Sequence, residues 1–276
     1  MHFESLGWLL PLAALLAAGL FAGFCAGMFG IGGGFVVVPA MLLVLPLLGG
    51  AKAEYAHVAV GTSAATIIVA SLRSVTAHAK RGAVDFEVLK SWAPWLIVGV
   101  VVGVALAGHV DGRGLLLIFA IGVILMSVNF LAPRLSEMVV STEMPSGLAI
   151  VAIAGPLGAF SSLLGIGGGT IAVTVMTWCS RTIHRAIATA SGMGVLIAAP
   201  TAVGFAIIGF GRAGLPWGSI GYVNLPAAIA ISSMSILTAP LGVAAAHRLP
   251  SGPLKRVFGG YLVLISLFMF RNALKA

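Results

Sequence analysis

The chain has 276 residues, of which 60% are hydrophobic and only 8% are charged. Soluble proteins average roughly 45–50% apolar and about 25% charged residues, so this composition excludes a soluble domain of any size and predicts an all-α polytopic membrane protein. The net charge of +8 reflects 15 basic against 7 acidic residues. Because the basic residues lie between apolar runs, they indicate orientation in a membrane and not a nucleic-acid partner.

The first half of the chain contains five apolar segments. Residues 6–27 are long enough to span a bilayer and lead into the run Gly30-Ile31-Gly32-Gly33-Gly34. Residues 35–48 follow, and as a helix they cover about 21 Å, less than the hydrocarbon core of about 30 Å. Three ordinary spans are expected at 55–76, 92–108 and 115–132, which complete a first transmembrane repeat over residues 1–132.

The second half repeats this order after a linker at residues 133–146. Residues 147–164 lead into the run Gly165-Ile166-Gly167-Gly168-Gly169. Residues 170–179 would form a helix of only about 15 Å, which predicts a segment that enters the membrane and returns. Spans at 186–209, 222–246 and 254–270 complete a second transmembrane repeat over residues 147–276.

Matching residues at nearly constant offsets indicate that the two halves form an internal repeat. The glycine runs lie 135 residues apart, and Gly82-Ala83-Val84-Asp85 lies 139 residues before Gly221-Tyr222-Val223-Asn224. Each half contains a broken or re-entrant helix pair plus three spans, which gives an odd number of crossings. We therefore expect two inverted repeats with about 8–10 membrane segments.

The basic residues predict which side of the membrane faces the cytoplasm. With the N-terminus outside, ten of them lie on or near the cytoplasmic side: Arg73, Lys80, Arg81, Lys90, Arg134, Arg181, Arg185, Arg248, Lys255 and Arg256. Five lie outside: Lys52, Arg113, Arg212, Arg271 and Lys275. The segment Met1–Glu4 lacks the basic region of a cleaved signal peptide, so the first span is expected to remain in the mature protein.

The two glycine runs are the predicted binding site. A helix that stops and resumes within lipid leaves unpaired backbone N–H groups at the start of the resumed half, which also carries the positive end of the helix dipole. Two such starts facing each other near the midplane would hold an anion. The alternative is that the glycines pack tight helix crossings. The residues predicted to bind substrate at the two starts are Gly32, Gly33, Gly34, Gly167, Gly168, Gly169 and Thr170.

Hydroxyl groups near the runs extend this prediction. Ser161 lies on the segment before the second run, and the third segments of the two halves carry Thr62, Ser63, Thr189 and Ser191 in corresponding positions. Such hydroxyls would add hydrogen-bond donors for an anion. The alternative for each of them is a hydrogen bond to its own helix backbone.

Charged and titratable groups within the spans are few. Arg73 is the clearest intramembrane charge and a candidate for the anion path, but it also lies close enough to Lys80 to extend to the membrane surface instead. His57, at the start of a span, is either a proton shuttle or a helix cap.

No enzymatic site is expected. Gly61-Thr62-Ser63-Ala64 is only superficially similar to the nucleophile pattern of intramembrane serine proteases, and the glycine runs lack the Lys-Ser/Thr ending of a P-loop. Cys25 and Cys179 lie in or beside apolar segments, which favours structural roles and predicts neither a disulfide nor a metal site. No cofactor is expected. Gly103, in an ordinary span, is expected to tolerate alanine.

The duplicated Gly-Ile-Gly-Gly-Gly resembles the signature of the TauE/SafE family of sulfite exporters. Gly23-Phe24 before the first copy and Val38-Pro39 after it are part of the resemblance, and so are Gly61-Thr62-Ser63, Gly82-Ala83-Val84-Asp85 and Ala188-Thr189. The resemblance covers essentially the whole chain. It departs at Thr174, which stands where the first copy has Pro39 and leaves open whether the second half-helix bends as the first does.

The resemblance implies a secondary transporter of small anions in the cell membrane, with sulfite, thiosulfate and C2 sulfonates such as sulfoacetate as the substrate class. Export by alternating access and a bacterial inner-membrane location are expected. The expected partners are a small anionic substrate and the lipid bilayer, and a homo-oligomer is left open. The alternatives are a passive anion channel and a non-transporting membrane scaffold.

Overall fold

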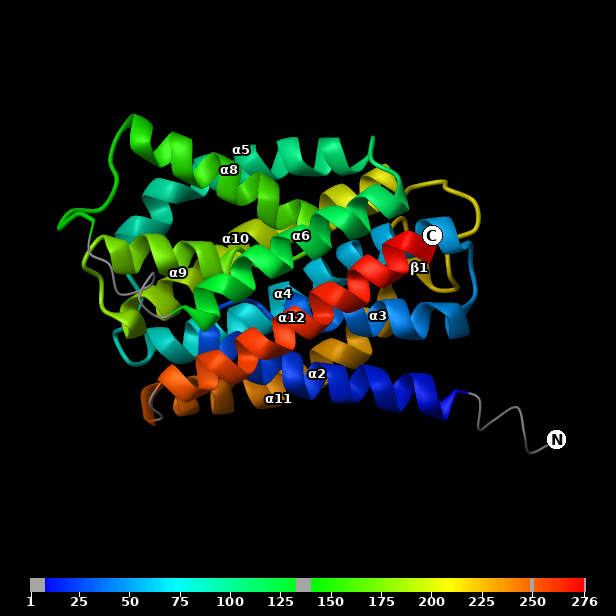
Figure 1. Ribbon diagram of the computed structural model, residues 1–276, viewed down its shortest axis with the longest axis horizontal. Helices are drawn as coiled ribbons and strands as arrows, with labels where there is room; N and C mark the ends of the chain where they lie inside the picture. The colour runs from blue at the N-terminus through cyan, green and yellow to red at the C-terminus, as the bar shows by residue number, and fades with distance from the viewer. Residues whose placement is uncertain (1–7, 133–139, 249–250, 276) are drawn as a thin grey trace.

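The computed structural model describes residues 8–132, 140–248 and 251–275. Within these residues the chain is almost entirely helical, with one short antiparallel pair of strands, Ser219–Ile220 (β1) and Val223–Asn224 (β2). In this part of the chain seven helices are long and apolar enough to cross a membrane, and three shorter apolar helices accompany them. The predicted all-α polytopic fold is confirmed (Figure 1).

The helices follow the predicted order. In the first half they are α2 (Leu9–Phe29), α3 (Gly34–Leu48), the 3₁₀ turn η1 (Lys52–Glu54), α4 (Tyr55–Ala79), α5 (Phe86–Ala107) and α6 (Gly112–Leu131). In the second half they are α8 (Leu148–Leu164), α9 (Gly169–Trp178), α10 (Ile183–Ile208), α11 (Leu225–Arg248) and α12 (Ser251–Lys275). Residues 133–139 of the predicted linker lie outside the described residues.

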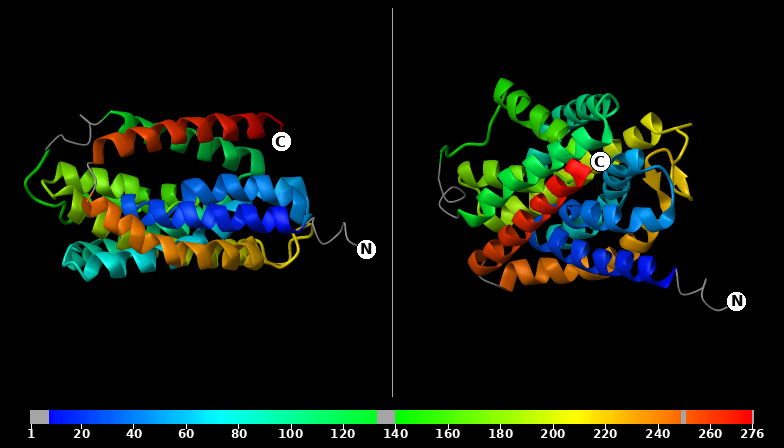
Figure 2. Two further views of the ribbon diagram at one scale, coloured as in Figure 1. Left: turned by 90° about the horizontal axis from the view of Figure 1, so that it is seen from below. Right: turned by 45° about the vertical axis from the view of Figure 1, so that its right-hand side comes forward.

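Corresponding helices of the two halves make corresponding contacts. Helix α2 packs along α11 as α8 packs along α5, α4 packs against α10, and α6 packs against α12. Figure 1 shows α4 and α10 between the α2/α11 and α5/α8 pairs, with α6 and α12 crossing over them, and Figure 2 shows the same layers from two other directions. Exchanging the two halves leaves these four packed pairs unchanged.

The two short helices belong to hairpins that enter from opposite ends of the bundle. The carbonyl of Trp178, at the end of α9, accepts hydrogen bonds from the backbone N–H groups of Val140 and Ser141 at 2.8 and 3.0 Å, so α9 returns to the end where α8 begins. Ala51, just after α3, donates to the carbonyl of Gly214 at 2.6 Å, near the end of α10. Helix α3 thus returns to the end from which α2 starts (Figure 1). Each short helix thus runs back to the end at which its hairpin begins, and re-entry of these segments into the membrane stays a prediction.

The opposed hairpins have the geometry that inverted repeats require, although a two-fold relation between the halves stays a prediction. The basic residues separate between the two ends. We call the end at which α10 begins the basic end; its described basic residues include Lys80, Arg81, Lys90, Arg181, Arg185, Arg248 and Arg256. The opposite end carries Lys52, Arg113, Arg212 and Arg271.

The repeated motif at residues 82–85 and 221–224 starts a helix in each half. The Asp85 carboxylate accepts from the N–H of Val88 at 3.3 Å and caps α5, and the Asn224 side chain accepts from the N–H of Ala227 at 3.1 Å at the start of α11. Such side-chain caps satisfy backbone donors that a helix start leaves unpaired. The motif is therefore explained by helix initiation.

The expectation that Gly103 tolerates alanine is wrong. A methyl group at this position would meet the Ala159 carbonyl and the Ser162 hydroxyl of α8, so the α5–α8 crossing has no room for alanine. Gly242 lies in the same way against the carbonyl of Phe24 at the α2–α11 crossing. Alanine at Gly103 is expected to be costly, because the groups that must move include backbone.

Candidate functional site

Both glycine runs form a break of the same shape. Gly30 and Gly165 end α2 and α8 in the left-handed conformation, with φ of 68° and 60°. Gly33 and Gly168 precede α3 and α9, also left-handed, with φ of 84° and 66°, and neither position has a side-chain cap. Glycine adopts this conformation without the steric cost of a Cβ atom. The chain therefore reverses sharply and presents uncapped helix starts inside the bundle.

The two breaks contact each other directly. A Cβ atom on Gly34 would overlap the carbonyl of Gly165, and one on Gly169 would overlap the carbonyl of Gly30. These four residues interlock the tips of the two hairpins. Gly34 and Gly169 therefore pack a tight contact between helices, which is the alternative to substrate binding considered in the sequence analysis.

Gly32 and Gly167 lie at the centre of this contact. The Cβ position of Gly32 is 3.4 Å from the Cα atom of Gly167 and 3.3 Å from the Ser71 hydroxyl. Ser71, on α4, also approaches the Cβ position of Gly194 on α10, at 2.6 Å. Sequence reasoning missed Ser71, which is the α4 hydroxyl that reaches the breaks and Gly194 together.

Three buried hydroxyls near the breaks have no hydrogen-bond partner. They belong to Ser71, Ser161 and Thr170, which are 1%, 0% and 4% exposed. The Ser161 hydroxyl lies 2.8 Å from the Cβ position of Gly168, and Thr170 is the second residue of α9. Leaving a buried polar group unpaired costs about 1–3 kcal/mol. Such groups mark a place where a ligand or water supplies the missing partner.

The hydroxyls of Ser161 and Thr170 have no counterparts in the first half. At the offset of 135 that relates the glycine runs, Ser161 corresponds to Ala26 and Thr170 to Phe35. The backbone of the break is repeated, but its polar side chains belong to the second break. The second break is therefore the more polar of the two.

The other predicted hydroxyls already have partners. Ser63 donates to the carbonyl of Gly165 at 2.7 Å and so holds the second break to α4. Ser191 donates to Ile187 at 3.0 Å, within its own helix, and contacts the Ser74 hydroxyl at 2.9 Å.

Thr62 and Thr189 join the two halves reciprocally. The Thr62 hydroxyl accepts from the N–H of Asn224 at 2.9 Å, and the Thr189 hydroxyl accepts from the N–H of Asp85 at the same distance. Each threonine thus satisfies a backbone donor of the capping residue in the other half. The arrangement gives both side chains a structural role.

Replacing Thr62 or Thr189 by valine is expected to lower stability without weakening substrate binding. Each substitution leaves a backbone N–H group without its partner, which costs about 1–3 kcal/mol in the free energy of unfolding. Thermal unfolding in detergent measures this loss, and transport kinetics provide the second readout. A large rise in KM at unchanged melting temperature would instead assign these hydroxyls to the substrate.

Arg73 lies away from the glycine breaks. Its side chain is exposed and lines a cavity near the basic end together with Lys80 and Arg81. The structure therefore agrees with the alternative in which Arg73 extends to the membrane surface.

His57 lies at the opposite end and supports a helix terminus. Its Nε2 atom is 3.1 Å from the carbonyls of both Ala107 and Val110, after the last turn of α5, and its ring stacks on Tyr222. Burial, with Glu54 as a further contributor, raises the pKa of Tyr222 to about 12. The structure gives His57 the contacts expected of a cap.

A cavity of about 410 Å³ opens between α6 and α9 and is lined mainly by apolar side chains. Thr170 and Asn129 are among its polar lining residues. The Asn129 amide donates to the Thr174 hydroxyl at 2.8 Å, which donates to the carbonyl of Thr170 at 2.9 Å. Thr174, which replaces the proline of the first copy, thus links the first turn of α9 to α6.

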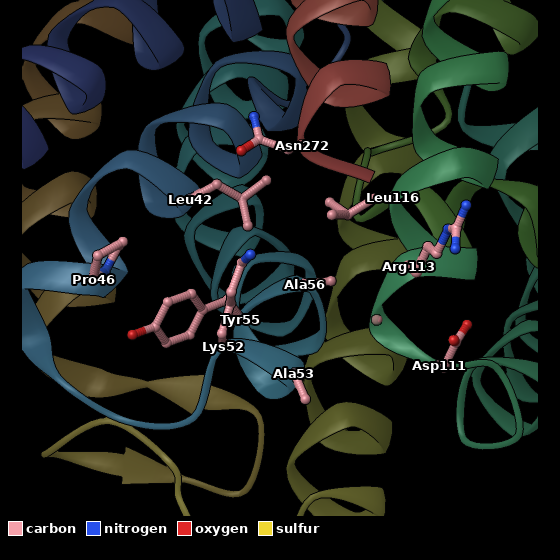
Figure 3. A pocket seen from close by; sticks show the side chains of 11 residues that line it. Leu42, Pro46, Lys52, Ala53, Tyr55, Ala56, Asp111, Arg113, Leu116 and Asn272 are labelled. Carbon is pink, nitrogen blue, oxygen red and sulfur yellow. The ribbon is translucent and has the colours of Figure 1, made fainter. Parts of the chain in front are cut away.

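A second cavity, of about 480 Å³, lies at the opposite end of the bundle between α3, α4 and α6. Figure 3 shows Lys52 extending into the space between Leu42 and Leu116, with Arg113 and Asp111 at its edge. The lining combines apolar walls with the basic residues Lys52 and Arg113 and the acidic residue Asp111.

Comparison with known proteins agrees with the fold and the motifs. The family model described as "Sulfite exporter TauE/SafE" matches residues 15–269. A "Probable membrane transporter protein" of Haemophilus influenzae is 32% identical over 255 residues, which cover 92% of this chain and 96% of the relative. One of Methanocaldococcus jannaschii is 26% identical over 279 residues, with 98% of both chains covered. No solved structure matches. Both relatives are named as probable membrane transporters, and the chain belongs to the TauE/SafE sulfite exporter family.

Proposed function

We propose that this protein is a secondary transporter that exports small anions, specifically sulfur oxyanions or organosulfonates such as sulfite, thiosulfate and sulfoacetate. The observation that carries the proposal is the pair of unpartnered, buried hydroxyls of Ser161 and Thr170 beside the uncapped start of α9. Together they supply neutral donors where the helix dipole favours negative charge.

In this proposal the anion binds at the second break. The unpaired backbone N–H groups at the start of α9, from Gly168 onward, form the positive end of the helix dipole and would donate to the anion. The hydroxyls of Ser161 and Thr170 would add two directional hydrogen bonds. The described lining of the adjoining 410 Å³ cavity contains no charged residue. Binding by neutral donors alone leaves the anion easier to release than binding by a fixed arginine.

Alternating access would expose the second break to each side in turn. The interlocked tips of the two hairpins separate the ends of the bundle, so movement of one hairpin relative to the other would open one path as it closes the other. The basic residues at both ends would concentrate anions at the mouths. By the excess of basic residues, the basic end is the cytoplasmic one and the N-terminus lies outside.

Counterflow in proteoliposomes tests the proposal. Vesicles loaded with unlabelled sulfite or sulfoacetate are expected to take up the labelled anion faster than unloaded vesicles, because a carrier returns faster when it is loaded. Protein-free vesicles are the control. Anion current without this acceleration would point to a passive channel, and the absence of both acceleration and current with any of these anions would contradict transport altogether.

A further inference from the structure

A third cavity, near the basic end, is lined mainly by basic and small residues. It has a volume of about 280 Å³ and lies between the last turns of α4 and the middle of α11. Its described lining residues are Arg73, Thr76, Ala77, Lys80, Arg81 and Pro240. Three of these six are basic and none is acidic, so the cavity carries positive charge that its described lining does not neutralise.

The sequence places these charges on one face of the chain. Arg73, Ala77 and Arg81 are spaced four residues apart, and Lys80 follows Thr76 by four, so their side chains point the same way along and just after α4. Arg81 donates to the carbonyl of Val243 at 3.1 Å and is thereby fixed to α11. The three positive charges around this cavity repel one another, and an anion among them would reduce that repulsion.

Leucines adjacent in sequence to the lining residues, or one helical turn from them, face outward. Leu72 on α4 is 51% exposed, and Leu237 and Leu241 on α11 are 61% and 60% exposed. In a membrane-spanning bundle such side chains contact lipid chains. A positive cavity bordered by outward-facing leucines near the end of a span has the two features that bind a lipid: charge for the headgroup and apolar surface for the tails.

We propose that this cavity binds the phosphate group of an anionic phospholipid, whose acyl chains lie against Leu72, Leu237 and Leu241. The site is separate from the substrate site, because none of its described lining residues belongs to either glycine break. The proposal gives Arg73 a function: a cation within a span that extends to the headgroup region and holds a lipid there.

The test compares binding of dioleoyl-phosphatidylglycerol and dioleoyl-phosphatidylcholine to the purified full chain in detergent, by native mass spectrometry and by thermal unfolding. Phosphatidylglycerol is expected to stay bound and to raise the melting temperature, whereas phosphatidylcholine does neither. Arg73→Gln combined with Lys80→Gln is expected to weaken phosphatidylglycerol binding at least tenfold. Arg185→Gln with Arg256→Gln is the matched control, since it removes the same charge from the same end outside the cavity and should leave binding unchanged.

Competition separates the lipid from a free anion. Inorganic phosphate and glycerol phosphate at millimolar concentration should not displace phosphatidylglycerol, because they lack the acyl chains. If they displace it fully, the cavity binds a free oxyanion and the lipid proposal is overturned. Equal binding of the two lipids, or equal loss in the control variant, overturns it as well. If the double variant does not fold, the lipid preference and the competition on the unmodified chain still decide. Lipid binding is measured without transport, so its failure is distinguishable from failure of the proposed transport.

Discussion

Gly169→Ala is expected to destabilise the protein severely, whereas Gly168→Ala is expected to abolish transport at a moderate loss of stability. The new methyl group at Gly169 would overlap the Gly30 carbonyl, and this backbone atom cannot move unless the hairpin tips separate. At Gly168 the methyl group would lie 2.6 Å from the end of Ile197 and 2.8 Å from the Ser161 hydroxyl, and both side chains can rotate away. The left-handed backbone at Gly168 adds about 1–2 kcal/mol.

The measurement pairs melting temperature in detergent with uptake in liposomes. Gly33→Ala is the matched control in the first break, because its methyl group would meet the Ala22 carbonyl at 2.7 Å and should lower stability and transport together. Transport by Gly168→Ala that falls only in step with its melting temperature would contradict a binding site at the second break.

The two helix breaks were predictable because their cause is local. A run of glycines inside an apolar segment removes helix propensity wherever the segment packs, and the ten residues of α9 are too few to cross a bilayer. The fold class and the order of segments follow from the same local features. In contrast, the clash at Gly103 depends on which helix crosses α5, and a single span does not contain that information.

The roles of individual hydroxyls were not predictable for the same reason. Thr62 and Thr189 occupy corresponding positions, and the structure explains this correspondence by a reciprocal contact with Asn224 and Asp85. From the sequence alone, this correspondence was interpreted as a duplicated substrate-binding site. Repetition in sequence marks whatever the two halves share, and here the shared feature is the contact between them.

The polar residues that differ between the halves were the more informative signal. Ser161 and Thr170 stand where the first half has Ala26 and Phe35, a difference visible in the sequence. Only the structure shows that both hydroxyls are buried and lack a hydrogen-bond partner. An exposed or hydrogen-bonded hydroxyl at either position would not indicate a ligand site. Ser71 and Asn129 were missed because other hydroxyl residues share their spans, and only the packing of the helices shows that Ser71 reaches the breaks and that Asn129 contacts α9.

Removing the unpartnered hydroxyls is expected to impair transport strongly while leaving the fold intact. Ser161→Ala and Thr170→Val each delete a donor that has no protein partner, so the melting temperature should stay the same or rise. A hydrogen bond to a charged ligand contributes about 1.5–3 kcal/mol, which corresponds to a rise in KM of roughly 10- to 150-fold for each residue. Ser71→Ala is expected to act in the same direction.

Ser162→Ala is the matched control for Ser161→Ala. Ser162 is the next residue of the same helix and equally buried, but its hydroxyl donates to the carbonyl of Ala159 at 2.9 Å and is not available to a ligand. Labelled sulfite and sulfoacetate uptake should therefore be close to normal in Ser162→Ala and strongly reduced in Ser161→Ala. Equal kinetics in the two variants would mean that Ser161 binds only an internal water. Because the melting temperature is expected to stay constant across this pair, a difference in KM between them reports on the anion and not on the fold.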